Sequence, residues 1–401
     1  MSQKSDKAIT IFEIFLTFLF LGFTSFGGPI AHVAFFRETL IKKKKWLEEE
    51  KFADYLALCQ FLPGPTSSQL GIAIGFDKSG IRGACVAWFA FTFPSAFLMI
   101  LFGYGILNYN EIIPIGALHG LKIAVVSVVA YAILDMAKSL TPDFKRKIFA
   151  LIIAVFLVFN SGPLIQMLSI LLGAIFGIIS SKKRNINKLR FLQVKNEQKL
   201  LSNFSLLIFL FLLIILPFFS KSFDNNTIKI FDTFYRSGSL VFGGGHVVLP
   251  LLQSQVVPQN WVSTNDFMAG YGLAQAIPGP LFTFSAYLGT VMSIEPNGWQ
   301  GGIICLSAIF LPSFLLVFGI LPYWEIFRKQ KYVQEALKGV NASVVGLLTA
   351  TFLNPVLTNA IVKIEDIILA IALLALLFFS KLSSVFIVII ATIFVWIFTL
   401  I

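Results

Sequence analysis

Two stretches of this chain read almost alike: FADYLALCQFLPGP at residues 52–65 and FMAGYGLAQAIPGP at residues 267–280. Further matched pairs surround them: FGGPIAH (26–32) with FGGGHVV (242–248), Trp46 with Trp261, FPSAF (93–97) with LPSFL (311–315), and ALHGLKIAVVSVV (117–129) with ALKGVNASVVGLL (336–348). The offset between partners starts at 216 and ends at 219. One unit has therefore been duplicated within the chain.

Composition places both copies in a membrane. Of 401 residues, 57% are hydrophobic and 13% charged, and the mean hydropathy is +0.85. A soluble domain carries roughly 25% charged residues. Apolar runs near the roughly 20 residues that cross a hydrocarbon core occupy 82–107, 114–137, 162–180, 204–220, 303–322 and 382–401. We expect an all-α integral membrane protein, multi-pass, in a bacterial-type inner (plasma) membrane, with residues 9–26 retained as a helix.

Loop charges predict that the two copies have opposite orientations. Loop 37–51 is rich in Lys and Arg, whereas its counterpart, 248–264, has neither. Loop 138–147 has four basic residues and its counterpart around 354–366 has one, but loop 108–113 has none while 323–338 has four. Because basic loops stay on the cytoplasmic side, the copies are expected to form inverted-topology repeats.

Division of the chain follows from this pattern. Residues 1–180 form the first repeat, 181–203 a basic cytoplasmic linker, 204–225 an extra transmembrane helix that inverts the second copy, and 226–401 the second repeat. The number of membrane crossings gives the two copies opposite orientations if the FGG and PGP segments do not cross completely, and are broken or re-entrant helices. Gly and Pro favour such breaks because they interrupt the backbone hydrogen bonds of a helix. Open backbone within a bilayer is tolerated where it lines a cavity or is packed in protein. Ordinary helix kinks are the alternative for these Gly and Pro residues.

These motifs resemble the chromate ion transporter family, in its long-chain, two-domain type. FGGPIAH, Trp46 and LCQFLPGPTSSQ (58–69) are similar to its first half, and FGGGHVVLPLL (242–252) and GYGLAQAIPGPLF (270–282) to its second. The resemblance implies efflux of chromate, an analogue of sulfate, driven by the proton motive force and giving chromate resistance. It also implies halves of opposite orientation.

A candidate anion site lies at the breaks, because free N–H groups and the dipole at a helix start favour anions. Facing half-helices from inverted copies could enclose one tetrahedral oxyanion. The candidate substrate-binding residues are Gly27, Gly28, His32, Gln60, Pro63, Gly64, Pro65, Thr66, Ser67, Gln69, Gly243, Gly244, Gly245, His246, Gln275, Pro278, Gly279 and Pro280.

Some of these residues have two interpretations. Gln60 and Gln275, each three residues before its Pro-Gly-Pro, either donate to the substrate or bond the carbonyls that the break frees. His32 and His246 are either proton carriers and anion donors or structural residues.

Other charged residues are candidates for coupling or for attracting anions. Arg37, Asp54 and Lys122 are named for these roles, and Glu13 and Asp135 are further carboxylates that could couple a proton to the anion. Arg37 could equally be a flanking charge whose head reaches the interface.

Other functional classes have less support in the sequence. The basic loops explain the net charge of +11 without nucleic acid. Cys59, Cys85 and Cys305 lie in apolar segments without metal-ligand spacing, so neither a disulfide nor a metal site is expected, and nothing points to a cofactor. A membrane-embedded lipid-phosphate enzyme would need a catalytic constellation that the sequence lacks. An anion channel stays open as an alternative to a carrier, and a homodimer stays open as an assembly.

Overall fold

The computed structural model describes residues 9–26, 28–109, 114–160, 163–180, 196–242, 248–380 and 384–399. Within these ranges all regular structure is helical, which confirms the all-α expectation. Five of the helices described are long and apolar enough to cross a membrane: Thr66–Asn108, Gly116–Leu140, Lys199–Ser222, Gly298–Tyr323 and Lys331–Ala360. Their outward faces carry large apolar side chains such as Phe93, Leu134 and Phe211, as a lipid-facing surface requires.

Helices of similar length follow one another in both repeats. Those of the first are α1 (Ile11–Thr24), α2 (Gly28–Phe36), α3 (Glu49–Phe61), α4 (Thr66–Tyr109), α5 (Ile115–Leu140), α6 (Phe144–Phe159) and α7 (Pro163–Ser180). Those of the second are α9 (Asn226–Leu240), α10 (Val248–Val256), α11 (Thr264–Ala276), α12 (Phe284–Val291), α13 (Gly298–Ile320), α15 (Lys331–Thr351), α17 (Ile364–Phe379) and α18 (Ser384–Phe398). Short connecting elements are η1 (Arg37–Lys43), η3 (Leu281–Thr283), η4 (Leu321–Tyr323), α14 (Trp324–Lys329), η5 (Phe352–Leu357) and α16 (Thr358–Ala360).

A tight turn inside α4 explains why the offset between the repeats changes. Ser79 and Gly80 leave helical geometry, so α4 doubles back and Gly75 packs against the backbone of Gly83. The second repeat makes the same hairpin from α12 and α13, joined by a longer connection, residues 292–297. The few extra residues in that connection account for the drift seen in the sequence.

Helices α2 and α3 are too short to cross a bilayer. They have 9 and 13 residues, so at about 1.5 Å per residue neither reaches the roughly 30 Å of a hydrocarbon core. Helices α10 and α11, with 9 and 13 residues, match them. Each pair precedes its Pro-Gly-Pro turn, as the re-entrant interpretation requires.

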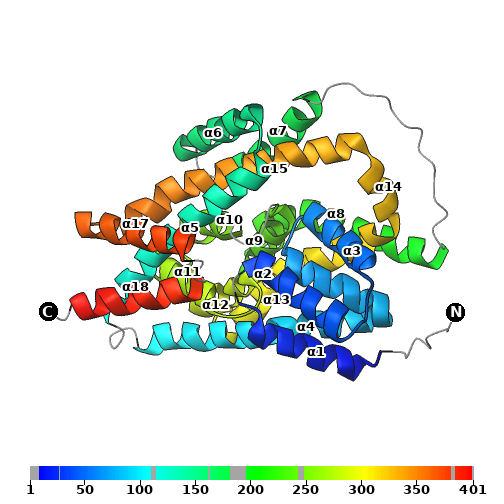
Figure 1. Cartoon of the computed structure of the whole chain (residues 1–401), viewed down its shortest axis with the longest axis horizontal. Coiled ribbons are helices and arrows are strands. Elements are labelled where there is room, and N and C mark those ends of the chain that lie inside the picture. Colours follow the sequence, from blue (N-terminus) through cyan, green and yellow to red (C-terminus); the bar gives the residue numbers. More distant parts are fainter. Residues whose placement is uncertain are drawn as a thin grey trace.

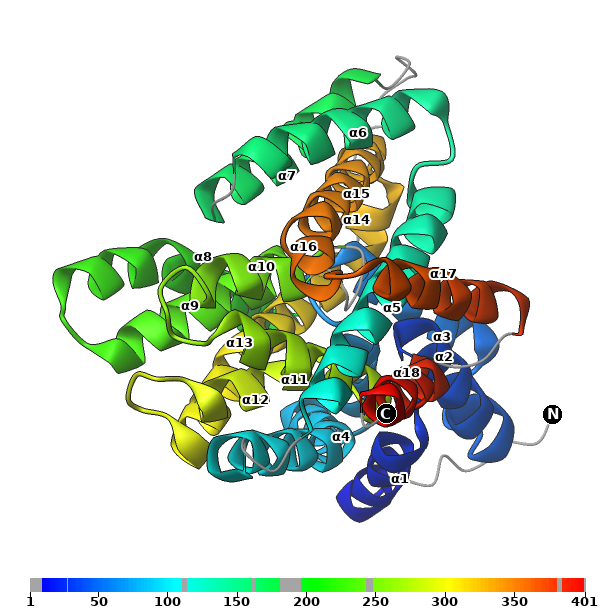
Figure 2. The same ribbon diagram turned by 90° about the vertical axis from the view of Figure 1, so that its left-hand side faces the viewer.

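The long helices α5 and α15 each pack against helices of the other repeat. Helix α5 packs against α17 and α18 of the second repeat, and α15 packs against α6 and α7 of the first, which Figure 2 shows in end view. Ser127 donates to the Ala370 carbonyl at 2.9 Å, and Ser343 donates to the Ser169 carbonyl at 2.6 Å. Small residues allow the close approach, since Gly339 lies against the backbone of Gly173.

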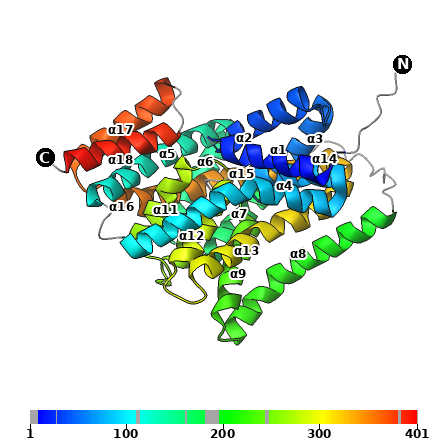
Figure 3. The same ribbon diagram turned by 90° about the horizontal axis from the view of Figure 1, so that it is seen from below.

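The unpaired helix α8 (Asn196–Ser222) begins inside the stretch that the sequence assigns to the linker. It lies along the outside of α9 and α13 (Figure 3). Its polar anchor is Ser220, which donates to Asp232 of α9 at 3.1 Å, while Arg236 makes a two-point ion pair with the same carboxylate. Tyr235 adds a 3.0 Å hydrogen bond to the Phe209 carbonyl.

Two groups of helices mark the ends of the longest axis. In Figure 1, α14 lies toward one end, and α17 and α18 lie toward the other.

Candidate functional site

Each Pro-Gly-Pro turn bonds the residue that comes directly before the Phe-Gly-Gly segment of the opposite repeat. The Gly64 N–H donates to the carbonyl of Val241 at 2.7 Å, and the Gly279 N–H donates to the carbonyl of Ser25 at 2.9 Å. Ser25 and Val241 occupy equivalent positions, directly before the two Phe-Gly-Gly segments. These two bonds link the repeats, and Gly64, Gly279, Ser25 and Val241 with the described residues around them are hereafter called the crossing.

Glycine is required at both turns. Gly64 and Gly279 have φ of +125° and +98°, a region that residues with a Cβ rarely adopt. A Cβ on Gly64 would lie 2.9 Å from Ser313 Oγ, and one on Gly279 would lie 2.6 Å from Ser95 Oγ. Ser95 and Ser313 are the matched serines of FPSAF and LPSFL. Each turn therefore packs against the Pro-Ser segment of the other repeat.

These contacts change the donors available to an anion. The Gly64 and Gly279 amides are bonded to carbonyls, so the amides predicted to face an anion are those of the helix starts that follow the turns. After the first turn α4 starts at Thr66, while after the second a 3₁₀ turn, η3, precedes α12. Gln69 donates to the Pro63 carbonyl at 2.7 Å and so holds the first turn in shape.

Hydroxyl groups remain as donors at the crossing. Ser25, Ser68, Thr92 and Ser313 are at most 1% exposed, and their hydroxyls have no hydrogen-bond partner among the residues described. Buried polar groups are nearly always bonded to protein, water or a ligand. Ser68 lies in the helix start whose hydroxyls the sequence suggests for an oxyanion. Ser25, Thr92 and Ser313 are additional, and the Pro-Ser pair repeated in both copies was a signal for Ser313.

His32 lies inside the crossing rather than at its rim. Its side chain is 2% exposed, its Nδ1 is 3.1 Å from the Ser67 hydroxyl, and the Ser25 backbone is a further hydrogen-bond partner. The ring also meets Phe91 edge-on. The structure thus brings together His32 and Ser67, as the sequence predicts, and adds Ser25.

Gln60 and Gln275 are equivalent in sequence but not in environment. Gln60 is exposed on α3, whereas Gln275 is 6% exposed and its Nε2 has no partner in the described part of the chain. Neither side chain bonds the carbonyls freed by its own break.

The charged candidates lie in polar contacts away from the crossing. Arg37 pairs with Glu49 at 2.5 Å, Asp54 with Arg328 of α14, and Lys122 donates to Asn265 of α11 at 2.7 Å. Glu13 bonds Thr10 at the start of α1, and Asp135 is exposed on α5. Near Arg37, a hydrogen bond from Lys42 lowers the pKa of Glu38, so this carboxylate stays ionised.

Five predicted site residues, namely Gly27, Gly243, Gly244, Gly245 and His246, lie outside the described residues. Gly28 begins α2 with a φ of +78°. Pro63 and Pro278 are half-buried and Pro65 and Pro280 buried, within the two turns.

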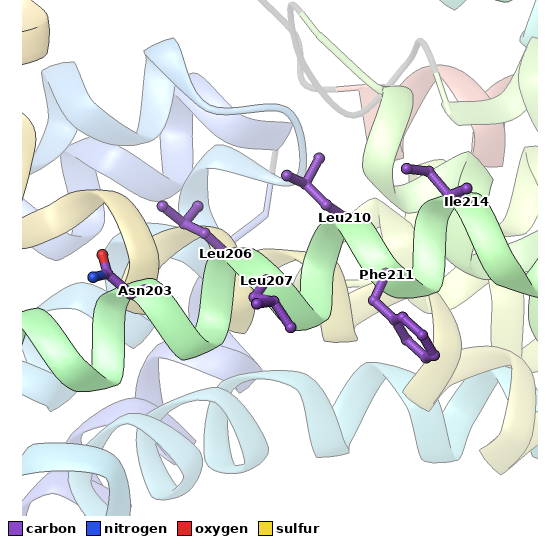
Figure 4. A pocket seen from close by; sticks show the side chains of 6 residues that line it. All are labelled: Asn203, Leu206, Leu207, Leu210, Phe211 and Ile214. Atoms are coloured by element: carbon purple, nitrogen blue, oxygen red, sulfur yellow. The ribbon is translucent and has the colours of Figure 1, made fainter.

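A groove of about 510 Å³ lies elsewhere, on the outer face of α8 (Figure 4). Five apolar side chains and Asn203 line it. This groove belongs to the lipid-facing surface and not to the crossing.

Comparison with known proteins agrees with this architecture. The sequence profile described as chromate transporter matches residues 12–178 and again residues 228–396. The chain belongs to the chromate transporter family. The profile thus matches twice, once in each copy of the repeated unit.

Individual members of the chromate transporter family match over most of their length. An uncharacterised transporter of Methanocaldococcus jannaschii is 30% identical over 84% of this chain and 82% of its own. A chromate transport protein of Cupriavidus metallidurans is 25% identical over 96% and 93%, and one of Pseudomonas aeruginosa is 23% identical over 85% and 80%. No solved structure matches the chain. Family membership and the five long apolar helices make the chain a multi-pass protein of the plasma membrane.

Proposed function

We propose that the chain carries chromate or a related oxyanion such as sulfate across the membrane, by secondary active transport, and that the anion binds at the crossing. The observation that carries this proposal is the reciprocal pair of hydrogen bonds, Gly64 to Val241 and Gly279 to Ser25. It joins both helix breaks at one place, the arrangement expected of a transporter site built from inverted repeats. The printed names of two relatives, chromate transport proteins, supply the substrate.

The chemistry of the crossing suits a tetrahedral dianion. The hydroxyls of Ser25, Ser68 and Ser313 can each donate one hydrogen bond, and they come from both repeats. A bound oxyanion is also close to the start of α4, where the helix dipole is favourable. Among the residues described, the buried carboxylates Asp232 and Asp366 are paired with Arg236 and His119. Neither of them adds an unpaired negative charge to the crossing.

Charge outside the crossing supports an anion that enters from the cytoplasm. Lys43, Lys44 and Lys45, exposed ahead of α3, have no ion-pair partner among the residues described. Arg37, Lys42, Lys51 and Arg328, which lie near them, are each paired with a carboxylate. The positive-inside rule puts these loops in the cytoplasm, and their potential concentrates anions at that face. Export follows as the direction of flux.

A proton is the proposed coupling ion, and His32 is the group at the crossing that titrates near neutral pH in water. It contacts Ser67 directly and can exchange a proton there as the anion binds or leaves. The same contacts suit a structural histidine, so His32→Gln distinguishes the roles: a coupling residue leaves exchange of anion for anion intact while it abolishes accumulation.

Everted membrane vesicles, with the cytoplasmic face outward, test the function. Labelled chromate should accumulate on energisation, saturate with concentration, compete with sulfate and collapse with a protonophore. Gly64→Leu and Gly279→Leu should insert normally and abolish the accumulation. A flux that neither saturates nor depends on the gradient would indicate a channel, and absence of flux for chromate, sulfate and related oxyanions would refute the proposal.

A further inference from the structure

The two re-entrant pairs differ in what covers them, although their sequences match. In the second repeat, α11 packs against α5 and α18, and α10 packs against α7 and α15. In the first repeat, α2 packs against α4 and η1, and α3 packs against α4. Asp54 and Phe61 of α3 also contact the short helix α14. The long helix α5 therefore covers one face of α11, and no long helix covers the corresponding face of α3 among the elements described.

Equivalent residues show the difference directly. Gly272 of α11 faces Leu121 of α5, and a Cβ on Gly272 would lie 3.1 Å from the Leu121 Cβ. Met268 and Gln275, on the same face of α11, are 0% and 6% exposed. Their counterparts on α3, Ala53, Ala57 and Gln60, are all exposed.

This uncovered face of α3 is not a lipid-facing surface. Lipid-facing helices here expose large apolar side chains, such as Phe204, Leu207 and Phe211 of α8. The exposed positions of α3 are Glu49, Glu50, Lys51, Ala53, Ala57 and Gln60. Two alanines and an amide, one turn from acidic and basic residues, suit contact with water. The face leads to Leu62 and Pro63, directly before Gly64 of the crossing.

We infer that Ala53, Ala57 and Gln60 line a hydrated path from the cytoplasmic side to the crossing, and that it closes when α15 packs on α3 as α5 now packs on α11. The identity of the solute in this path, a small oxyanion, rests on the proposed function. In the second conformation, in which α15 covers α3, Val340 contacts Ala57 as Leu121 now contacts Gly272. The Lys122–Asn265 contact opens, and its counterparts, Asn341 and Glu50, come together.

The rest of the packing makes such an exchange feasible. The α5 contacts with α17 and α18 match the α15 contacts with α6 and α7: Gly120 of α5 lies against the backbone of Ala391 in α18, and its counterpart Gly339 of α15 lies against the backbone of Gly173 in α7. These six helices can move as one body because their mutual contacts are already equivalent in both repeats. What differs between the repeats is which re-entrant pair that body covers.

Accessibility of matched cysteines tests the path. In a background with Cys59, Cys85 and Cys305 replaced by serine, Gln60→Cys and Gln275→Cys form the matched pair. The membrane-impermeant probe methanethiosulfonate ethyltrimethylammonium should label Gln60→Cys at least about tenfold faster than Gln275→Cys. The labelling should occur from the cytoplasmic face in everted vesicles and not in right-side-out vesicles. Equal labelling of both, or an inert Gln60→Cys, would overturn the path.

Paired cysteines test the exchange. Leu121→Cys with Gly272→Cys should crosslink without substrate and stop transport reversibly. A Cβ on Gly272 would lie 3.1 Å from the Leu121 Cβ, and a shift of a few tenths of an ångström brings the pair into the disulfide range of about 3.5–4.5 Å. Ala57→Cys with Val340→Cys should crosslink during turnover with sulfate and an imposed gradient, and then protect Gln60 from a probe such as the same methanethiosulfonate. Failure of the second pair to crosslink while transport proceeds would overturn the exchange. Correct labelling without flux of any oxyanion would instead refute the proposed function and leave the path standing.

Discussion

The amide of Gly64 is 2.7 Å from the carbonyl oxygen of Val241, a residue 177 positions further along the chain and directly before the second Gly-rich break. Its partner bond, from Gly279 to Ser25, repeats the relationship with the roles of the two repeats exchanged. Neither turn can be displaced without disturbing the break of the other repeat.

Alanine at either turn glycine is expected to disable transport. A Cβ on Gly64 would lie 2.6 Å from Gln69 Nε2, and the positive φ adds strain of about 1–3 kcal/mol. Gly64→Ala and Gly279→Ala should each lower the chromate uptake rate by about tenfold or more and lower the thermal stability in detergent. Gly105→Ala is the control, because a Cβ there meets no atom within 4 Å. Wild-type uptake in both turn variants would contradict a role for the crossing.

Removal of the Ser313 hydroxyl should affect binding rather than folding. This hydroxyl has no partner among the described residues, so Ser313→Ala removes no intramolecular hydrogen bond. If it donates to the anion, KM should rise about 5- to 30-fold, which corresponds to about 1–2 kcal/mol, with an unchanged melting temperature. Ser343→Ala is the matched control, because its hydroxyl bonds Ser169 at 2.6 Å: stability should fall by about 1 kcal/mol and KM should stay constant. If Ser313→Ala instead lowered the melting temperature and left KM unchanged, Ser313 would be a packing residue.

Loss of Asp232 should destabilise the attachment of α8. Asp232→Ala leaves Arg236 without its carboxylate partner and should lower the free energy of unfolding by about 3–5 kcal/mol, measured as loss of folded protein on heating in detergent. The first repeat has Leu16 and Phe20 at these positions, both facing outward. The double variant Asp232→Leu, Arg236→Phe should therefore recover most of the stability. A double variant as unstable as Asp232→Ala would show that the charges themselves hold α8.

Lys122 should control which re-entrant pair is covered. Lys122→Met removes the 2.7 Å hydrogen bond to Asn265 and weakens the contact between α5 and α11. A loss of about 1 kcal/mol shifts a two-state population about fivefold. Methanethiosulfonate labelling should therefore accelerate at Gln275→Cys and slow at Gln60→Cys. Unchanged labelling rates at both positions would show that Lys122 does not control which re-entrant pair is covered.

Much of this architecture could be predicted from the sequence, because duplication and helix breaks leave local signals. The matched Pro-Gly-Pro turns, the short helices before them and the extra helix all occur where the repeated motifs place them. The sequence also predicts His32 and Ser67 in the same site, and they do meet.

The pairing between repeats could not be predicted, because it depends on which segments face each other in space. No local pattern shows that Gly64 bonds Val241. The difference between Gln60 and Gln275 was also hidden, because matched sequences cannot show which copy is covered in one conformation. Asp232 and Arg236 were missed because neither is repeated in the other copy.

The exchange of long helices has a consequence for biosynthesis. Helices α6 and α7 leave the ribosome well before α15, the helix that packs against them. The interval between the synthesis of α5 and that of its partner α18 is longer still. The nascent first repeat must therefore wait in the lipid with its contact surface for α15, which includes Gly173 and Gly177, unfilled. A product truncated before α15 would leave this surface of small residues without its partner helix.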